Sequence, residues 1–383
     1  MGIIFFEGFE TIGTEIGNAN RSTVVPRLNQ RYPAAQGVSS GDDPRGYLQD
    51  DSEAEGFCWR TADSGGNACK IRFIYPQSVQ DIISMQGEQS GQTPKIHIVG
   101  FRLHVRSVSQ TMTLWSHAYK SNSGVDTFSH INVLNLHIVN STDLLLRRGG
   151  TTLATATAAL TPGQWHYIEL KFRISDTGGA QTTDGLGIVN VDGTEVINFT
   201  GDTDADLFTN STSRDYVGFS FEFSLGSSSD ASDYWALDDL YALFPEGESA
   251  PYDDFLGPVR VIRFSLDGDN SPLEWTPSTG SDHFSLVDEN GADATDYVES
   301  DTDAQVDTFT LTDFGGGGTI YALKAEVEAI NTVGGTPNLI LGIDGTTITN
   351  VVDDTVNYDV FPVYKDAAGF DSSEVSIQFD NGF

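Results

Sequence analysis

The groups of this sequence that could do chemistry are mainly carboxylates, and their spacing limits what they could do. Glu7 and Glu10 are three residues apart, and Asp238 and Asp239 are adjacent. In an extended strand, residues at these spacings point to opposite faces. Retaining hydrolysis of a glycosidic bond needs two carboxyl groups about 5 Å apart beside the same bond. The sequence therefore predicts no catalytic pair and no catalytic residue.

Other catalytic and metal-binding signatures do not appear in the sequence. The nucleophile motif Gly-x-Ser-x-Gly is absent. The histidines show no spacing on one element that would suit a metal ion; they are His97, His104, His117, His130, His137, His166 and His283. His166 lies on the apolar face of an expected strand, so we expect it to point into the core. We therefore expect a protein that is not an enzyme.

Calcium is one hypothesis for the four carboxylates. Asp238 and Asp239 lie in an otherwise apolar strand, where an unpaired carboxylate is costly. One of them, with Glu7 or Glu10 from the opening strand, could hold Ca²⁺ in a shell of hard oxygen ligands. The alternative is that one Asp caps backbone amides at a bulge while the other meets solvent or an arginine.

Aromatic residues offer a second hypothesis, a sugar-binding face. Trp115, Tyr119, Trp235 and Tyr241 could stack on sugar rings if their strands exposed them. Aromatic rings in strands are more often core residues, and the sequence identifies no ligand-binding residue. The glycine run at residues 315–318 lacks the Lys-Ser/Thr of a phosphate loop, so we expect a flexible turn.

Charge and composition exclude several classes of protein. The chain of 383 residues has 55 Asp and Glu against 20 Lys and Arg, so its net charge is 20 − 55 = −35. This charge disfavours nucleic acid and anionic membrane surfaces as partners. No apolar run approaches the roughly 20 residues of a membrane helix. Residues 1–10 lack the basic region and cleavage site expected of a signal peptide.

The two cysteines leave two alternatives open. Cys58 and Cys69 lie on either side of a turn-rich stretch, so a disulfide across a local hairpin is geometrically allowed. Disulfide frameworks usually have more cysteines, which favours two buried thiols in a protein assembled in the cytoplasm.

Short alternating segments predict β-strands throughout the first part of the chain. In residues 95–106 the apolar phase shifts by one near Gly100, which predicts a bulge there. Asp192-Gly193 predicts a tight hairpin turn. The expected strands are residues 95–106, 111–118, 131–139, 143–147, 164–175, 186–191, 195–200, 216–224 and 234–244.

A domain boundary is expected near residue 247. Residues 1–247 carry 16 basic and 29 acidic residues (16 − 29 = −13), whereas residues 248–383 carry 4 and 26 (4 − 26 = −22). We expect a first domain at residues 1–247, a linker at 248–257 and an acidic β-sandwich domain at 258–383. The strands expected in the second domain are residues 259–264, 284–287, 307–311, 319–330, 338–343, 346–351 and 374–379. Residues 319–330 also have helix-forming composition, but their alternation favours a strand.

Several segments of the first part resemble one fold family. Gly163-Gln-Trp-His-Tyr-Ile-Glu-Leu170, the hairpin Val191-Asp-Gly-Thr-Glu195 and the closing strand Trp235-Ala-Leu-Asp-Asp-Leu-Tyr-Ala-Leu243 resemble the concanavalin A-like (laminin G-like) jelly roll. The opening Phe5-Phe-Glu-Gly-Phe-Glu10 is similar to the first strand of that family, which usually pairs with the closing one. The resemblance covers residues 1–247. It implies an all-β jelly-roll sandwich, and calcium near the Asp pair in some members.

The following segments resemble structural proteins of tailed bacteriophages. They are Asp254-Phe-Leu-Gly-Pro-Val-Arg-Val261, Trp275-Thr-Pro-Ser-Thr-Gly280, and Val287-Asp-Glu with Asp296-Tyr-Val298. In those proteins a jelly roll is followed by a second β domain. The resemblance implies a virion protein, assembled in the host cytoplasm and attached to other proteins of the capsid or tail.

The functional expectation is a non-enzymatic virion structural protein that decorates or attaches to the capsid or tail. Its partners would be other virion proteins and further copies of itself, with a homotrimer as one expected form. The alternative is a carbohydrate-binding, lectin-like module that recognises glycans of the host surface, with calcium as its cofactor.

Overall fold

A computed structural model of the protein describes residues 3–8, 46–51, 56–61, 68–74, 96–107, 112–121, 134–174, 185–203, 214–224, 234–245, 247–263, 265–288, 295–312, 319–332, 335–343, 345–352, 359–366 and 374–380. Within these residues every regular element is a β-strand except one short 3₁₀ turn. None of their helical segments is long and apolar enough to span a membrane. The all-β class predicted from the sequence is confirmed.

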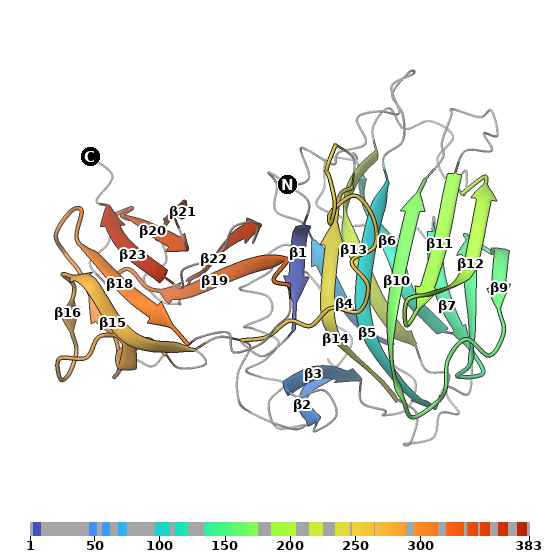
Figure 1. Ribbon diagram of the computed structural model, residues 1–383, viewed down its shortest axis with the longest axis horizontal. Coiled ribbons are helices and arrows are strands. Elements are labelled where there is room, and N and C mark those ends of the chain that lie inside the picture. The colour runs from blue at the N-terminus through green and yellow to red at the C-terminus, as the bar shows by residue number, and fades with distance from the viewer. Residues whose placement is uncertain are drawn as a thin grey trace. The chain divides into compact units, whose positions relative to one another are not determined.

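The chain divides into two units, the first ending at Val261 and the second running from Ile262 to Phe383. Residues 248–257, expected to be a linker, therefore lie in unit 1. Unit 1 contains two antiparallel sheets, which Figure 1 shows as two layers. The arrangement is the jelly-roll sandwich that the sequence predicted.

The larger sheet of unit 1 has the strand order β12-β11-β10-β5-β14-β3-β2, and β1 also pairs with β14. This pairing of the opening strand with the closing strand confirms the prediction. The strands are β1 (Ile3–Glu7), β2 (Gly46–Asp51), β3 (Gly56–Thr61), β5 (His97–Ser107), β10 (Trp165–Arg173), β11 (Gly185–Val191), β12 (Thr194–Gly201) and β14 (Tyr234–Leu243).

The other sheet of unit 1 has the order β4-β13-β6-β7-β8-β9. Its strands are β4 (Ala68–Ile74), β6 (Met112–Ser121), β7 (Leu134–Val139), β8 (Asp143–Arg148), β9 (Thr151–Ala156) and β13 (Arg214–Ser224). The core lies between the two sheets, where the ring of Phe101 on β5 packs edge-on against that of Phe221 on β13 at 4.8 Å.

Strand β10 is buried on both of its faces. Ile168, Leu170 and Phe172 face the core and are fully buried. Tyr167 and Glu169, on the opposite face, are buried as well. An ordinary sandwich strand leaves its outer face to water, so something must cover this sheet from outside.

The bulge predicted near Gly100 is wrong in its location. The pairing of β5 with β10 is regular from His97 to His104. The register shift lies on the neighbouring strand β14, between Asp238 and Tyr241. Apolar residues appear in both phases of β5 because both of its faces are buried, so its backbone needs no bulge at Gly100.

Of two local predictions for unit 1, one is confirmed and the other is corrected. The hairpin at Asp192-Gly193 is confirmed, with φ of 50° and 76°. His166 does not point simply into the core: its Nδ1 lies 2.7 Å from Asp192 Oδ2, and its Nε2 accepts the N–H of Thr161 at 2.9 Å. This imidazole ties two turns together at the end of the sandwich.

The two strands that carry the cysteines do not form the local hairpin on which the disulfide alternative depends. Cys58 lies on β3, which pairs with β2 and β14 in the larger sheet. Cys69 lies on β4, which pairs with β13 in the other sheet. The turn-rich sequence between them thus joins the two sheets.

Unit 2 is built on a five-stranded antiparallel sheet with the order β15-β18-β23-β20-β21, and β19 and β22 pair separately. Its strands are β15 (Leu266–Leu273), β16 (Thr276–Pro277), β17 (Val298–Glu299), β18 (Val306–Leu311), β19 (Ala322–Ala329), β20 (Asn338–Ile343), β21 (Thr346–Val351), β22 (Asp359–Asp366) and β23 (Glu374–Asp380). A cluster that includes Phe309, Leu323, Leu341 and Ile377 forms the core.

Three predictions for this part of the chain can be compared with the structure. Residues 319–330 do form a strand, β19, and not a helix. Residues 284–287 were predicted to be a strand but contain the 3₁₀ turn η3 (Phe284–Leu286). The strand predicted at 259–264 is absent from the described residues 259–263, where the N–H of Val261 donates to a side chain, Asp239 Oδ1.

Gly100 is the position where the packing of the larger sheet should be most sensitive. A Cβ built at Gly100 would lie 2.0 Å from the Tyr241 ring. We expect Gly100→Ala to lower the free energy of unfolding by about 3 kcal/mol, because the ring must move. Gly150→Ala is the matched control, since its Cβ meets nothing within 4 Å. Chemical denaturation of both variants measures the difference, and equal stabilities would contradict the packing described.

Candidate functional site

The buried acidic groups of unit 1 gather on the outer face of the larger sheet. Glu169 on β10 and Tyr241 on β14 both pair with Gly100, which lies between them on β5. Because Gly100 has no side chain, the Tyr241 ring lies over it and its hydroxyl donates to Glu169 Oε1 at 2.5 Å.

The register shift in β14 brings Asp238 and Asp239 to the same buried region. Asp239 has a φ of 50°, a conformation that Asp and Asn tolerate better than most residues. Its N–H donates to Asp238 Oδ1 at 2.8 Å, and its carbonyl accepts the hydroxyl of Tyr167 at 3.1 Å. Both carboxylates are only 1% exposed.

Residues 254–261, called here the covering segment, bind this cluster through their backbone. The N–H of Gly257 donates to Glu169 Oε1 at 2.9 Å, and that of Leu256 donates to the Tyr241 hydroxyl at 3.3 Å. Farther along, the N–H of Val261 donates to Asp239 Oδ1 at 2.8 Å. The segment has no strand partner for these amides, so side chains of the sheet accept them instead.

A lysine fixes the other end of the covering segment. Lys171 Nζ lies 3.0 Å from Asp254 Oδ1, an oxygen that also accepts the N–H of Phe255 at 2.8 Å. The same ammonium lies 5.8 Å from the centre of the Phe255 ring. Although partial burial favours the neutral acid, the hydrogen bonds from Lys171 and Phe255 lower the pKa of Asp254 below its ordinary value.

Burial dominates the ionisation of the cluster itself. It raises the pKa of Glu169, against the hydrogen bonds from Tyr241 and Gly257 that favour the carboxylate. Burial raises the pKa of Asp239 to about 6, although the N–H of Val261 and the guanidinium groups of Arg260 and Arg102 oppose the shift. Burial and neighbouring groups also raise the pKa of Tyr167 and Tyr241 well above the usual range.

Two arginines lie at the edge of the cluster. Arg102 Nη1 and Arg260 Nε are each 3.9 Å from Asp239 Oδ2. The guanidinium of Arg102 also lies over the Trp165 ring, 4.8 Å from its centre. A charged group at this distance offsets part of the cost of a buried carboxylate.

The residues proposed as calcium ligands are only partly brought together. Glu7 is buried, pairs with Leu240 of β14 and accepts the N–H of Gly8 at 3.1 Å, while Glu10 lies outside the described residues. Within the residues that the structure describes, no group of three or more His, Cys, Asp or Glu is placed to hold a metal ion. The contacts of the Asp pair agree with the alternative to calcium: Asp238 caps an amide at the bulge, and Asp239 faces two arginines. Calcium binding stays a prediction.

The aromatic residues proposed for sugar stacking are buried where their side chains are described. Trp235 lies inside the sandwich and Tyr241 beneath the covering segment, each at most 1% exposed. The hypothesis that Trp235 and Tyr241 stack on a sugar is therefore wrong. The side chains of Trp115 and Tyr119, and the glycine run at 315–318, lie outside the described part.

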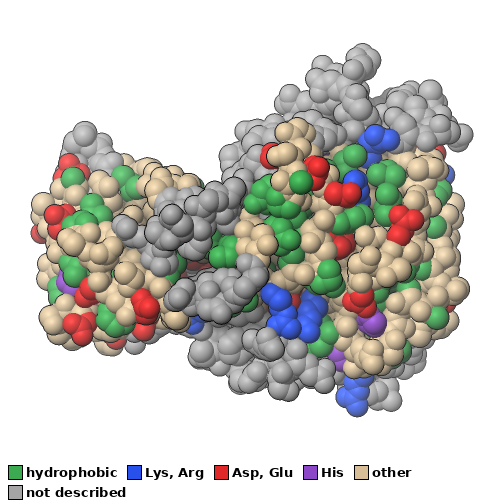
Figure 2. All heavy atoms as spheres, viewed as in Figure 1, with side chains coloured by type: hydrophobic (Ala, Val, Ile, Leu, Met, Phe, Trp, Pro, Cys, Tyr) green, Lys and Arg blue, Asp and Glu red, His purple; other side chains and the backbone are tan. Residues whose placement is uncertain are grey.

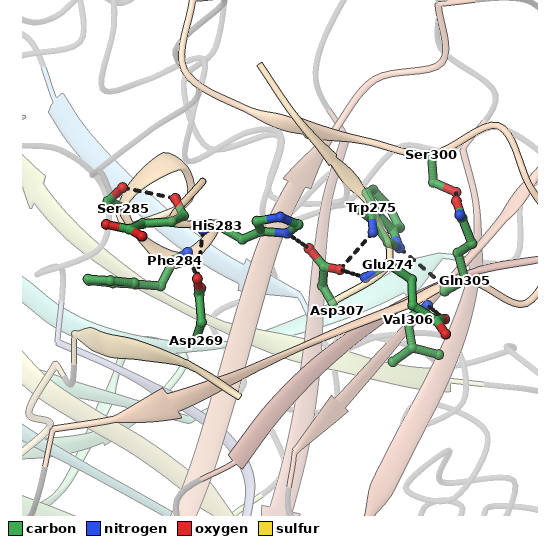
Figure 3. A network of polar contacts seen from close by, with 11 residues as sticks. Asp269, Glu274, Trp275, His283, Phe284, Ser285, Ser300, Gln305, Val306 and Asp307 are labelled. Carbon is green, nitrogen blue, oxygen red and sulfur yellow. Dashed lines mark hydrogen bonds and ion pairs between the residues drawn. The ribbon is translucent and has the colours of Figure 1, made fainter. Parts of the chain in front are cut away.

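A second polar network lies in unit 2 and centres on Asp307 of β18 (Figure 3). Asp307 Oδ2 lies 2.6 Å from His283 Nδ1, and Asp307 Oδ1 accepts the N–H groups of Glu274 and Trp275. Asp269 accepts the N–H groups of His283 and Phe284. Among the described residues no hydroxyl or thiol is hydrogen-bonded to this histidine, so the pair lacks the nucleophile of a catalytic triad. It holds the irregular chain around η3 against β18.

Sequence reasoning missed the central role of Glu169 and of the covering segment. The alternation of Tyr167, Glu169 and Lys171 along β10 is typical of a solvated sheet face, so it gave no sign that Glu169 is buried. Nothing in the spacing shows that the backbone of residues 254–261 supplies the partners.

No protein-family model matches the chain, and no curated protein matches it significantly. Solved structures resemble its fold. The alginate lyase Aly36B has 12% identity and a TM-score of 0.38, covering 63% of this chain and 97% of its own. The alginate lyase of polysaccharide lyase family 14 from Aplysia kurodai has 12% identity and a TM-score of 0.41, with 63% and 99% covered. The carbohydrate recognition domain of Emp47p has 10% identity and a TM-score of 0.34, with 63% and 95% covered.

These likenesses concern the concanavalin A-like jelly-roll fold, in agreement with the strand order of unit 1. The matched structures include lyases and a carbohydrate recognition domain, so what they share with this chain is the fold. The bacteriophage resemblance stays a prediction.

The hydroxyl of Tyr241 should be essential for holding the covering segment. Tyr241→Phe removes the donor to Glu169 and the acceptor for the Leu256 N–H. We expect the free energy of unfolding to fall by about 2–3 kcal/mol, and the amides of residues 256–257 to exchange hydrogen faster. Tyr297→Phe, at an exposed tyrosine, controls for the substitution itself. Unchanged exchange in Tyr241→Phe would show that the segment is held by other contacts.

Asp239 should make stability depend on pH in a defined direction. Its pKa is raised from 3.8 to about 6, so the folded state binds this proton more tightly than the unfolded chain. The resulting stabilisation is complete below pH about 4 and is lost as the pH rises through about 6. Asp239→Asn keeps an acceptor for Val261 and does not ionise. Relative to wild type it should gain up to about 3 kcal/mol between these pH values.

Urea unfolding, followed by tryptophan fluorescence across this pH range, measures that difference. Asp301→Asn, at an exposed carboxylate, controls for the loss of one negative charge. A constant difference between Asp239→Asn and wild type would show that Asp239 does not titrate in this range.

Proposed function

We propose that the chain is a non-enzymatic structural protein of a tailed-bacteriophage virion, attached to the capsid or tail through protein–protein interfaces. The observation that supports this most is the covering segment. The buried acidic and phenolic groups of unit 1, which could have formed a reaction centre, bind the backbone of the protein's own residues 256–261.

The chemistry of the cluster agrees with a structural role. Glu169 already accepts hydrogen bonds from Tyr241 and from Gly257, so a substrate would have to displace both the segment and the hydroxyl. The carboxylate of Asp239 is occupied by the Val261 amide and lies beside two arginines. Neither group is presented to a ligand from outside.

The charge of the surface indicates the kind of partner. Acidic side chains are spread over the visible face of both units in Figure 2, in keeping with the net charge of −35. Such a surface repels anionic envelopes and free nucleic acid. It also steers association towards basic surfaces of other virion proteins.

Location on a particle is the direct test of the proposal. Antibodies against the purified chain should label intact, gradient-purified particles of the encoding phage in immunogold electron microscopy. The chain should also remain with the particles through repeated sedimentation. Particles that carry neither label nor chain would contradict the proposal.

The carbohydrate-binding alternative gives a different set of results. It requires binding to host-surface glycans on an array, abolished by EDTA if calcium takes part. An enzyme would cleave a saccharide, and Glu169→Gln or Asp239→Asn would remove that activity. We expect no binding to the glycan array and no cleavage of saccharides.

A further inference from the structure

The last strand of the five-stranded sheet in unit 2, β21, has the properties of a docking edge. In the described part of the chain it pairs with β20 alone. The pairing is regular from Asn338–Val351 to Ile343–Thr346, without a register shift. The outer edge of such a strand presents backbone N–H and C=O groups to any further strand.

The side chains of β21 leave that edge accessible. Four of its residues, Thr347, Ile348, Thr349 and Val351, are exposed. Ile348 and Val351, the two large apolar side chains of the strand, are 38% and 49% exposed. The strand contains no charged residue and no proline, the usual means of protecting an edge.

The opposite edge of the same sheet is protected. Strand β15 has two register shifts against β18, and it contains Pro272 as well as Asp267 and Asp269. Shifts, proline and charge all hinder pairing with another chain. The two edges of one sheet therefore differ, and only β21 is suited to pairing.

The surroundings of β21 are acidic. From residue 262 to residue 383 the sequence has 3 basic and 23 acidic residues, or 3 − 23 = −20. Asp344 precedes the strand and Asp353-Asp354 follow it. Asp380 of β23 pairs with Asn338, which in turn pairs with Val351 at the end of β21.

We propose that β21 binds an extended segment of another protein, rich in β-branched residues and flanked by Lys or Arg, which adds a sixth strand to the sheet. Backbone hydrogen bonds and contacts with Ile348 and Val351 supply the affinity. The net charge of −20 over residues 262–383 selects basic flanks. This deepens the proposed function, on which it rests for the assumption that the partner is a protein.

A second copy of this chain fits the edge poorly. Two copies would meet with like charges, because each carries a net charge of 3 − 23 = −20 over residues 262–383. Like charges oppose association. The charge pattern therefore favours a different, basic chain.

The test uses the purified full-length chain and two synthetic peptides. Both have alternating threonine and valine, one flanked by lysine pairs and the other by glutamate pairs. The lysine-flanked peptide should bind at low salt, slow hydrogen exchange across β21 and not across β15, and weaken as salt rises. The glutamate-flanked peptide should bind at least about tenfold more weakly than the lysine-flanked peptide.

Matched variants separate the two edges of the sheet. Ile348→Lys places a charge on β21 and should weaken binding of the lysine-flanked peptide by about tenfold or more. Leu273→Lys on β15, where the leucine is 39% exposed, should leave it unchanged. Unfolding midpoints equal to wild type establish that both variants are folded.

Three results would each overturn the inference. The lysine-flanked peptide could fail to slow hydrogen exchange across β21, or the two peptides could bind equally well. Ile348→Lys and Leu273→Lys could also weaken peptide binding equally. A dimer of the chain alone that Ile348→Lys dissociates would assign the edge to a second copy, which also overturns it. Labelling of particles can succeed when peptide binding fails, so the two proposals fail separately.

Discussion

The hydrogen bond from Tyr241 to Glu169 across Gly100 is the contact on which the arrangement of unit 1 depends. It requires glycine at position 100, because the Tyr241 ring crosses β5 where any side chain would lie. It also buries a carboxylate on a sheet face that would otherwise be wet, which is costly unless the carboxylate is hydrogen-bonded. The covering segment meets that requirement with the N–H of Gly257. Sheet and segment are thus mutually necessary.

This dependence explains why the chain remains attached to unit 1 well past the last strand of the sandwich. The final anchor is the bond from the Val261 amide to Asp239. Arg263, two residues later, donates to the carbonyl of Asp288 within unit 2. The bulge in β14 therefore has a function in the architecture: it turns Asp239 towards the place where the chain leaves the sandwich.

The sequence predicts the regular parts of this fold and misses those held by side chains. Strands β20 and β21 agree with prediction to the residue because alternation and a Gly turn define them. Strands β15 and β22 were missed since Pro272 and Pro362 and several charges disrupt their patterns. The candidate site was missed in part. Asp238 and Asp239 were singled out as costly in an apolar strand, but Val261, whose amide Asp239 accepts, was predicted to lie in a strand at 259–264.

Buried acids have the same use in both units, although the surroundings differ. In unit 1, Glu169 and Asp239 accept amides from the covering segment. In unit 2, Asp307 accepts the amides of Glu274 and Trp275 after β15, and the half-buried Asp269 accepts those of His283 and Phe284 at η3. In each case the amides that are bound belong to residues outside the β-strands. Because a carboxylate has several acceptor sites, it can bind more than one amide at such a place. Among the residues that the structure describes, Glu169, Asp239, Asp269 and Asp307 thus share one structural use: each carboxylate binds backbone that belongs to no strand.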